Sequence, residues 1–367
     1  MIHIVIGTKA QLIKMAPVMR RLQERGIEYN YIATGQHQST MDDIHANFGI
    51  RGPDVRLYSG PDITSIMSMA VFGARILWKA LRQRATIFRS DRNGIVLAHG
   101  DTVSTLLGAL MGRLCGVKVG HVESGLRSFN LLAPFPEELT RLAVFRLSQY
   151  YFCPGDWAIE NLKRYCGVKI NTGANTLADA LGYALPTDDK VPPGLIPENP
   201  FAVATLHRFE NIRSPESMMR LIDAVLMVAE QHRLLFVLHA PTEIRLRRFG
   251  YYDRLAAHPN IDLRPRYDYF DFIRLILRSE FVVSDGGSNQ EECHYLGKPL
   301  LLLREVTERL EGLDTNAVLS RFEPEAIRKF LRNYKELAKP PAQQQTSPTD
   351  IIIDACSEFH SSLLIQE

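Results

Sequence analysis

The chain has 367 residues, of which 46% are hydrophobic and 23% are charged, and its formal net charge at pH 7 is +2. These values are those of a soluble globular protein that is long enough for two domains of ordinary size. The basic residues are scattered rather than gathered in blocks, which argues against a nucleic-acid surface but leaves room for a basic site that binds one anionic ligand.

Cysteine usage and the first residues indicate the cellular compartment. The five cysteines form no CxxC pair and no zinc-type spacing with histidine, which is typical of reduced, mostly buried thiols in a cytoplasmic protein. The sequence begins directly with a strand-like segment, so we expect no signal peptide. No stretch approaches the roughly 20 uninterrupted apolar residues of a membrane span. Residues 66–81 instead have the pattern of an amphipathic helix that faces the core, with a surface membrane contact as the lesser alternative.

Strand-like and helix-like segments alternate along the first half of the chain. The expected strands are 2–6, 29–34, 94–98, 117–121 and 150–154. The expected helices are 11–23, 41–48, 102–114, 137–148 and 157–165. Strands that alternate with helices in this way predict βαβ units and a parallel sheet.

A stretch rich in proline and acidic residues, 184–200, interrupts this pattern and is typical of a linker. A second alternating series follows. Its expected strands are 201–206, 233–240, 261–265, 280–285 and 299–304, and its expected helices are 215–230, 243–249, 270–277 and 290–296. We therefore predict an α/β protein with two Rossmann-like domains, 1–183 and 201–345, that face each other across a cleft. A last helix within residues 346–367 would pack back on the first domain.

Three acidic motifs lie in the first domain: HGD at 99–101, GHVESG at 120–125 and PFPEELTR at 134–141. Asp101 and Glu123 follow strand-like segments, and Glu137 begins a helix-like one. The carboxyl ends of parallel strands meet at the edge of the sheet where ligands bind. Asp101 could instead cap the helix that follows it, and acids in a first helical turn suit the helix dipole. The convergence of three acids favours proton transfer.

GTKAQLIKMAP at 7–17 is a strand-to-helix turn without GxGxxG, so the sequence gives no support for dinucleotide binding. Lys9 and Lys14 could meet a phosphate near the helix start, or they could be two solvated lysines. In the second domain, the motif TLHRFEN at 205–211 ends a strand. There His207 could be a general acid or base, or a hydrogen-bonded loop histidine. His239 occupies a similar place after the next strand.

SDGGSNQEE at 284–292 runs from a strand through a glycine turn into a helix that we expect to begin near position 289. Glycines let the backbone approach a ligand, and free N–H groups at a helix start bind phosphate. Glu291 or Glu292 could accept a ribose hydroxyl. Arg304 and Arg309 could hold a diphosphate. The alternative is a capped helix with surface arginines.

Together these motifs resemble those of the UDP-N-acetylglucosamine 2-epimerases, nearly end to end and in the same order. The family pattern reads GTRPEAIKMAP, QHR, HGDTTT, GHVEAGLR, PWPEEANR, GHRREN, DSGGIQEE and RDTTERPE. This chain has GTKAQLIKMAP, GQHQ, HGDTVS, GHVESGLR, PFPEELTR, LHRFEN, DGGSNQEE and REVTERLE. The resemblance implies a glycosyltransferase-B arrangement with an interdomain cleft, no metal, no cofactor, a UDP-sugar as the partner and a homodimer.

By motif matching, the resemblance also implies the roles of single residues. The catalytic set would be Asp101, Glu123, Glu137, Arg141 and His207. The UDP-binding set would be Lys9, Lys14, His239, Gly286, Gly287, Ser288, Glu292 and Arg309. The implied reaction inverts C2 of a UDP-2-acetamido sugar by elimination of UDP to a glycal and readdition, in the synthesis of cell-surface polysaccharide precursors.

Several positions depart from the family pattern. Lys9 stands where the family has arginine, Ala10-Gln11 replaces Pro-Glu, and DSGGI has become DGGSN. Gln38 replaces the arginine of QHR, which helps bind a second, activating UDP-sugar in the bacterial members that do not hydrolyse their substrate. These departures leave open whether such activation persists. They also leave room for a hydrolysing enzyme that releases UDP and free N-acetylmannosamine, or a diacetamido analogue of it.

Two further functions are alternatives. A UDP-sugar-dependent glycosyltransferase of the same fold would need one dominant base and an acceptor groove, whereas the cleft expected here is rich in acids. A catalytically silent protein that binds sugar nucleotides as a sensor or scaffold is disfavoured by the intact acidic set.

Overall fold

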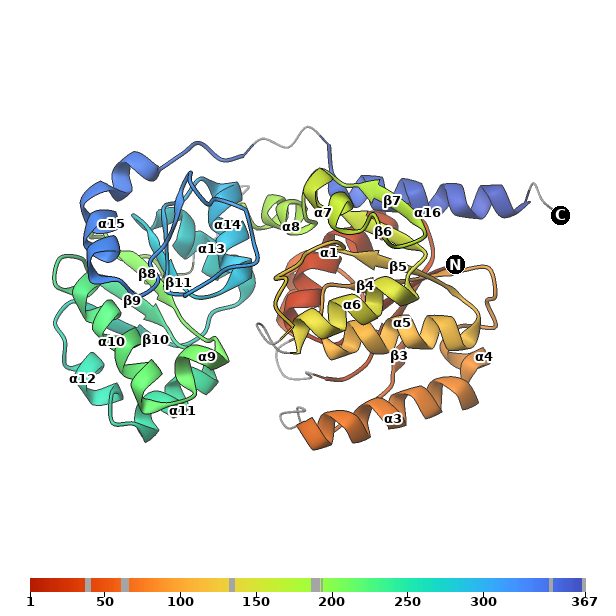
Figure 1. Cartoon of the computed structure of the whole chain (residues 1–367), viewed down its shortest axis with the longest axis horizontal. Helices are drawn as coiled ribbons and strands as arrows, with labels where there is room; N and C mark the ends of the chain where they lie inside the picture. Colours follow the sequence, from red (N-terminus) through yellow and green to blue (C-terminus); the bar gives the residue numbers. More distant parts are fainter. Residues whose placement is uncertain are drawn as a thin grey trace. The chain divides into compact units, whose positions relative to one another are not determined.

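The computed structural model describes residues 1–36, 41–60, 66–131, 136–185, 192, 194–342 and 346–364. Gln38, the departure within the QHR motif, lies outside the described residues. The chain divides into two compact units, one formed by residues 1–183 with 344–367 and the other by residues 184–343. Figure 1 shows both units, coloured along the sequence.

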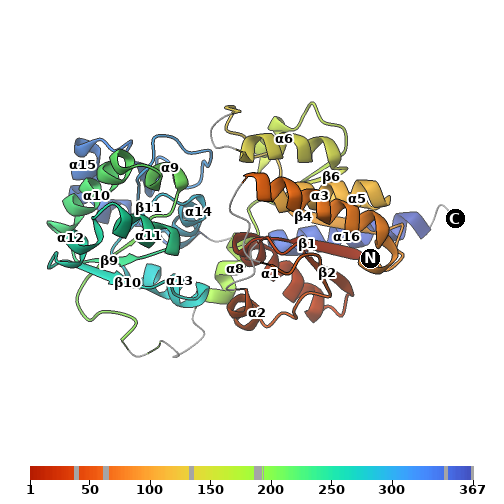
Figure 2. The ribbon, with the colours of Figure 1, turned by 90° about the horizontal axis from the view of Figure 1, so that it is seen from below.

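The first unit is built on a parallel sheet, in which the described strands follow the order β3-β2-β1-β4-β5-β6-β7. Figure 2 labels β1, β2, β4 and β6 of this sheet. These strands are β1 Ile2–Ile6, β2 Tyr29–Ala33, β3 Val55–Arg56, β4 Ile95–His99, β5 Lys118–Val122, β6 Tyr150–Cys153 and β7 Val168–Asn171. The central strands β1, β2 and β4 are buried along their whole length, as is typical of parallel strands covered on both faces. Val5 pairs with Ala98, which pairs with His121, so β1, β4 and β5 end side by side.

Helices connect these strands. The helices described in the first unit are α1 Lys9–Glu24, α2 Asp42–Phe48, α3 Ile66–Arg82, α4 Arg84–Ile87, α5 Val103–Cys115, α6 Glu137–Leu147, α7 Asp156–Asn161, α8 Leu177–Ala184 and α16 Pro348–Leu364. α3 and α5 share a core with Val5 and Val96 of the sheet. α16 packs against α1, where Asp350 forms ion pairs with Arg21 and Arg25 at 3.0 and 2.8 Å.

The second unit repeats the plan with a parallel sheet whose described strands follow the order β10-β9-β8-β11-β12-β13. These strands are β8 Ala202–Thr205, β9 Leu234–Val237, β10 Ile261–Arg264, β11 Val282–Ser284, β12 Leu300–Leu302 and β13 Ala317–Leu319. The described helices are α9 Phe209–Ile212, α10 Pro215–Ala229, α11 Ala240–Arg248, α12 Tyr252–Ala256, α13 Tyr269–Arg278, α14 Gly287–Leu296 and α15 Pro324–Leu337. Its core joins Phe236 and Phe281 of the sheet to Val225 of α10 and Phe330 of α15.

Both sheets reverse their strand order beside the first strand of the unit. β1 lies between β2 and β4, and β8 lies between β9 and β11. At such a switch point the connections after the two central strands leave on opposite sides, and ligands bind outside the carboxyl ends. The segments expected to carry ligand-binding residues are therefore those after β1, β4 and β5 in the first unit, and those after β8 and β11 in the second.

The predicted α/β class with two Rossmann-like sheets is confirmed, and the differences concern element ends. α14 begins at Gly287 rather than near position 289, so the predicted glycine turn is the first turn of a helix. α7 ends at Asn161 rather than at 165, because turns follow it. The described elements that the sequence analysis did not predict are β3, β7, β13, α4, α8, α9, α12 and α15.

None of the helices in the described ranges is both long enough and apolar enough to cross a bilayer.

Candidate functional site

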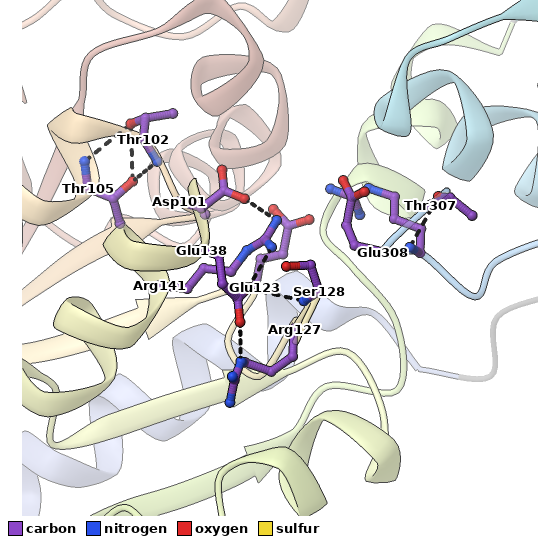
Figure 3. Close-up of polar contacts among 12 residues, drawn as sticks. Asp101, Thr102, Thr105, Glu123, Arg127, Ser128, Glu138, Arg141, Thr307 and Glu308 are labelled. Atoms are coloured by element: carbon purple, nitrogen blue, oxygen red, sulfur yellow. Dashed lines mark hydrogen bonds and ion pairs between the residues drawn. The ribbon is translucent and has the colours of Figure 1, made fainter. Parts of the chain in front are cut away.

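Asp101, just after β4, belongs to a chain of alternating charges that runs into α6 (Figure 3). Arg141 donates through Nη2 to Asp101 Oδ2 at 2.5 Å and through Nη1 to Glu138 Oε2 at 3.2 Å. Glu138 also accepts Arg127 Nε at 2.5 Å and the Ser128 amide at 3.0 Å. Burial alone would raise the pKa of Glu138, but Arg127, the Ser128 amide and Arg141 together lower it below its usual value. The predicted residues Asp101 and Arg141 are thus in direct contact.

The two neighbouring glutamates of PFPEELTR have different environments. Glu138 is fully buried at 0% exposure, and its carboxylate holds the segment before α6. Glu137, the predicted catalytic residue, is only partly buried at the first position of α6. The buried contacts with Arg127, Ser128 and Arg141 are thus made by Glu138, and Glu137 lies at the start of the helix.

Glu123 follows β5 and forms the second buried ion pair. Lys14 Nζ of α1 donates to Glu123 Oε1 at 2.9 Å, and His99 Nε2 lies 3.3 Å from Glu123 Oε2. The Lys14 and Glu123 side chains are 4% and 5% exposed. A Cβ added to Gly100 would lie 3.5 Å from Glu123 Oε2, so Glu123 touches the turn that carries Asp101. The structure places Lys14, predicted for UDP, beside a predicted catalytic acid.

The backbone of Glu123 is in the left-handed region, with φ of +64°. This conformation is unfavourable for a residue with a side chain and costs on the order of 1–3 kcal/mol. Strain of this kind persists where the surroundings hold the residue, here the Lys14 and His99 contacts. In this conformation the Glu123 side chain reaches His99 at the end of β4.

His121 was not among the predicted site residues, although it ties the two acidic turns together. Its Nε2 donates to Gly100 O at 2.7 Å, and Ser124 Oγ lies 2.9 Å from Nδ1. Burial lowers the pKa of His121 to about 4, so the ring is neutral near pH 7. A neutral ring can donate at Nε2 while Nδ1 accepts from Ser124.

Lys9 lies at the first position of α1, where its Nζ is 2.7 Å from Asp43 Oδ2 of α2. The Asp43 side chain is 29% exposed. Lys9 is therefore at a helix start, as the sequence analysis expected, and its contact is with an acid that water can reach.

In the second unit, Asp285 organises the end of β8. Its carboxylate is completely buried and accepts the amides of His207 and Arg208 at 2.9 and 3.1 Å and Asn211 Nδ2 at 3.0 Å. Because Asp285 directly follows β11 and the three donors lie in the segment after β8, this carboxylate joins the two strands of the switch point. Asp285 and Asn211 were not predicted; the signal was an acid directly after a buried strand.

His207 stacks on His239, with ring centroids 4.5 Å apart and planes inclined by 22°. Burial lowers the pKa of His207, and the opposing effect of Asp285 is offset by Arg208 and Arg266. Both predicted histidines thus meet at the ends of β8 and β9, and a lowered pKa favours the neutral form of His207.

The start of α14 lies against both His207 and Arg309. A Cβ added to Gly286 would be 2.9 Å from His207 Cε1, and one added to Gly287 would be 2.7 Å from Arg309 Nε. No side chain caps this helix start. Ser288, the predicted third member of a turn, is inside the helix. The predicted phosphate-binding group of backbone amides and Arg309 is therefore brought together.

Two glutamates of α14 point to different partners. Arg309 Nη1 is 2.5 Å from Glu291 Oε1, and both residues are buried. Glu292 Oε2 accepts Asn289 Nδ2 at 2.8 Å and is also buried. The structure therefore distinguishes Glu291, which holds Arg309, from Glu292, which the resemblance assigned to UDP.

Glu308 is a further charged group that was not predicted. Arg304 Nη2 donates to its Oε2 at 2.8 Å and Arg208 Nη2 to its Oε1 at 3.3 Å. Burial alone would raise the pKa of Glu308, but Arg304, Arg208 and Arg309 lower it to about 2. The loop after β12 thus carries a permanent carboxylate that fixes two arginines.

Within the described ranges, no group of three His, Cys, Asp or Glu side chains is arranged to hold a metal ion.

Comparison with known proteins gives consistent matches. A family model described as UDP-N-acetylglucosamine 2-epimerase matches residues 20–349. The UDP-N-acetylglucosamine 2-epimerase of Bacillus subtilis is 33% identical over 327 residues, which cover 86% of this chain and 81% of that protein.

Solved structures agree with this match. The UDP-GlcNAc 2-epimerase of Neisseria meningitidis bound to UDP-GlcNAc has a TM-score of 0.80 at 27% identity, with 100% of both chains covered. The Methanocaldococcus jannaschii UDP-GlcNAc 2-epimerase in complex with UDP-GlcNAc and UDP has a TM-score of 0.82 at 25% identity, covering 97% of this chain and 99% of that one. A Rickettsia africae glycosyltransferase shares the fold alone, with a TM-score of 0.54 at 14% identity. The predicted glycosyltransferase-B-like fold is thereby confirmed.

Proposed function

Because the chain belongs to the UDP-N-acetylglucosamine 2-epimerase family of enzymes, we propose that it inverts C2 of a UDP-2-acetamido sugar. The hydrogen at C2 of such a sugar is not acidic, so direct removal would be slow. Loss of UDP from C1 gives oxocarbenium character, and loss of the C2 proton then forms a glycal. Readdition of UDP, with protonation from the opposite face, inverts C2.

The observation that carries this proposal is the two carboxylate ion pairs in the first unit, the partly exposed Asp101 with Arg141 and the buried Glu123 with Lys14. Elimination and readdition need acid–base groups for the two faces of the sugar ring. We assign this work to Asp101, Glu123, Glu137 and His207, with Arg141 holding Asp101 in place. A preorganised set of charges also stabilises a cationic transition state without reorganisation during the reaction.

The second unit supplies the groups that suit a departing diphosphate. The amides of Gly286, Gly287 and Ser288 at the start of α14 carry the positive end of the helix dipole. Arg309 lies against Gly287 and adds a charged donor. We assign UDP binding to these residues together with Lys9, His239 and Glu292. Lys14 is also assigned to UDP binding, and its contact with Glu123 brings it beside a proposed catalytic acid.

The reaction is tested by incubating the protein with UDP-N-acetylglucosamine in D₂O and following proton NMR spectra. The proposal expects the UDP-manno sugar with deuterium at C2, because the returned proton comes from solvent. Release of UDP and free N-acetylmannosamine would show instead that the enzyme catalyses the hydrolysing reaction. Consumption only after an acceptor is added would indicate a glycosyltransferase. Binding without any reaction, for this and for diacetamido or 6-deoxy substrates, would contradict the proposed enzyme activity.

We also propose that the enzyme works as a homodimer in the cytoplasm, on precursors of cell-surface polysaccharides. Among the side chains of α3 whose burial the structure describes, Val71, Trp78 and Leu81 are large, apolar and exposed, at 46%, 60% and 54%. Leu114 of the adjacent α5 is 50% exposed. Apolar patches of this kind mark association surfaces. Because a two-fold interface uses the same patch on both chains, one such face suffices for a dimer.

A further inference from the structure

The side-chain amide of Gln11, in the first turn of α1, is buried and hydrogen-bonded on both sides. Its Oε1 accepts the amides of Gly7 and Thr8 at 2.9 and 3.1 Å. Its Nε2 donates to His99 O at 2.7 Å and to Thr105 Oγ1 at 2.9 Å. Gln11 is 2% exposed. Two acceptor positions and two N–H groups are all that a carboxamide has, and every one of them is used.

The two sides of this amide have different tasks. Oε1 completes the capping box of α1 with Thr8, a role that glutamate fills equally well. Nε2 instead reaches across to the end of β4 and the start of α5, 88 and 94 positions away. Helix capping alone therefore explains an acceptor at position 11, and it does not explain the donor.

Only a hydrogen-bond donor can satisfy the two groups that face Gln11 Nε2. His99 O is an acceptor, and Thr105 Oγ1 uses its hydrogen on the same His99 O at 2.6 Å. The Thr105 hydroxyl therefore presents a lone pair to residue 11. An ionised glutamate would face two acceptors, and only its protonated form could donate to one of them. The amide of Gln11 supplies both hydrogens at any pH.

The segments that Gln11 joins are in close contact. A Cβ added to Gly7 would lie 1.8 Å from Ser104 Oγ, so the turn after β1 and the start of α5 leave no space between them. Between His99 and Asp101 lies Gly100, whose φ of +71° sets a tight turn. His99 also contacts Glu123 at 3.3 Å. A displacement of the His99 backbone would therefore move both acids.

We propose that Gln11 is a positioning residue that holds the His99–Asp101 turn for catalysis independently of pH. The inference rests on the proposed function, in which Asp101 and Glu123 act on the sugar.

The ionisable groups on the surrounding elements are of mixed sign. α1 itself carries Lys9 and Lys14, the end of β4 contributes His99 and Asp101, and β5 contributes His121 and Glu123. Of these, Lys14 is paired with Glu123 and Asp101 with Arg141. None of these pairs involves the carbonyl of His99, so the charge of a substituted residue 11 acts on that carbonyl directly.

The test is Gln11→Glu, measured as C2 deuterium incorporation between pH 6 and 9. The variant keeps the capping box, so the fold is retained, and only the donor becomes dependent on a proton. Burial raises the pKa of such a carboxyl group. Below that pKa, turnover should stay within about threefold of the wild type. Above it, relative turnover should fall about tenfold for each pH unit, as expected for one essential proton. A profile parallel to that of the wild type would overturn the proposal, and so would an equal loss at every pH.

Gln149→Glu is the matched control. Gln149 precedes β6, at the opposite edge of the same sheet, and its Oε1 accepts the Val119 amide at 2.8 Å. A carboxylate accepts this hydrogen as well as an amide does, so the same change of charge should leave the pH profile unaltered. If the turnover of this control also fell at alkaline pH, the effect would be due to net charge, which would contradict a specific role for Gln11.

Hydrogen exchange separates this inference from the proposed function. In Gln11→Glu at pH 9, the amides of segments 6–12 and 99–105 should exchange faster than in the wild type at the same pH, with no difference at pH 6. This readout needs no turnover, so it decides the positioning role even if UDP-N-acetylglucosamine is not a substrate.

Thr105→Val is the second variant: it removes a donor to His99 O without adding an acid, so turnover should fall at all pH values. Unchanged turnover there would also count against the proposal.

Discussion

Lys14 Nζ and Glu123 Oε1 lie 2.9 Å apart, and both side chains are nearly closed off from solvent. A charge at such depth needs partners of opposite charge, because moving an unpaired ion out of water is expensive. Lys9 is on the same helix, five positions earlier, and pairs with Asp43, whose side chain is 29% exposed. The two lysines lie on the same helix, but their removal has different consequences. Removal of Lys14 leaves a buried carboxylate, whereas removal of Lys9 leaves a carboxylate that water can reach.

We expect Lys14→Met to destabilise the protein by about 3–5 kcal/mol, the usual cost of leaving one partner of a buried pair uncompensated. Lys9→Met should cost less than about 1 kcal/mol, because water can reach Asp43. Urea unfolding of both variants at pH 7 measures the difference. Equal free energies of unfolding for the two variants would contradict the distinction between Glu123, which is buried, and Asp43, which water can reach.

We expect Asp101→Asn and Glu123→Gln to reduce turnover by roughly 10²–10⁴-fold, the usual contribution of an acid–base residue. Neither side chain is assigned to the diphosphate, so UDP affinity measured by calorimetry should change little. Near-normal turnover in both variants would remove the two residues from the proposed catalytic set.

A change at Arg309, in contrast, should mainly affect UDP affinity. Arg309→Lys keeps a positive charge beside Glu291, which limits damage to the fold, but it loses the planar fork that suits a diphosphate. We expect weaker UDP binding, with thermal stability close to that of the wild type. Unchanged UDP affinity in this variant would refute the assignment of Arg309 to the leaving group.

The parallel sheets could be predicted because their strands are continuous apolar runs, such as Leu300–Leu302, between helix-like segments. α15 is absent from the predicted elements although its signal is present. Ile327, Phe330, Leu331 and Tyr334 repeat at helical spacing and are all buried. The start of α14 was placed too late because the two glycines suggested a turn, whereas Gly287 is the first helical residue.

The site was less predictable, since its contacts join residues far apart in the chain. Lys14 and Glu123 are 109 positions apart, and no local pattern tells which acid a lysine meets. Glu137 and Glu138 are equivalent helix-start acids in the sequence. Successive residues of a helix are rotated by about 100°, so the two acids have different surroundings, and Glu138 is the one that is fully buried. The positions of acids after strands could be read from the sequence, but their partners required the fold.

His121 makes stability depend on pH in acid. Its pKa is 6.5 in an exposed setting and about 4 in the fold, where burial opposes the charge. Below pH 6.5 the unfolded chain therefore binds a proton that the folded chain does not, and stability falls as the pH falls until about 4. Between pH 7 and pH 5 this histidine should account for a loss of about 2 kcal/mol.

His121→Gln isolates this contribution. The glutamine amide can still donate to Gly100 O, as His121 Nε2 does, but it does not titrate. Urea unfolding at pH 7 and pH 5 should show a smaller loss for the variant. His3 has a similarly lowered pKa of about 4 and remains in both proteins, so its effect cancels in the comparison. An identical pH dependence in the two proteins would show that His121 is not the titrating group.

The proposed dimer predicts the effect of a charge on the exposed side of α3. Trp78→Glu would appear twice across a two-fold axis, so two carboxylates would face each other in an interface that is apolar in the wild type. The helix itself should tolerate the change. The Arg82 guanidinium carbon now lies 4.6 Å from the centroid of the Trp78 ring. Because Arg82 is four residues after position 78 on the helix, it can form an ion pair with the new glutamate. We therefore expect a folded monomer, measured by light scattering coupled to gel filtration. Ile244→Glu on α11, where the side chain is 64% exposed, is the control and should leave the dimer intact. A wild-type monomer, or a Trp78→Glu variant that is still dimeric, would exclude this face as the interface.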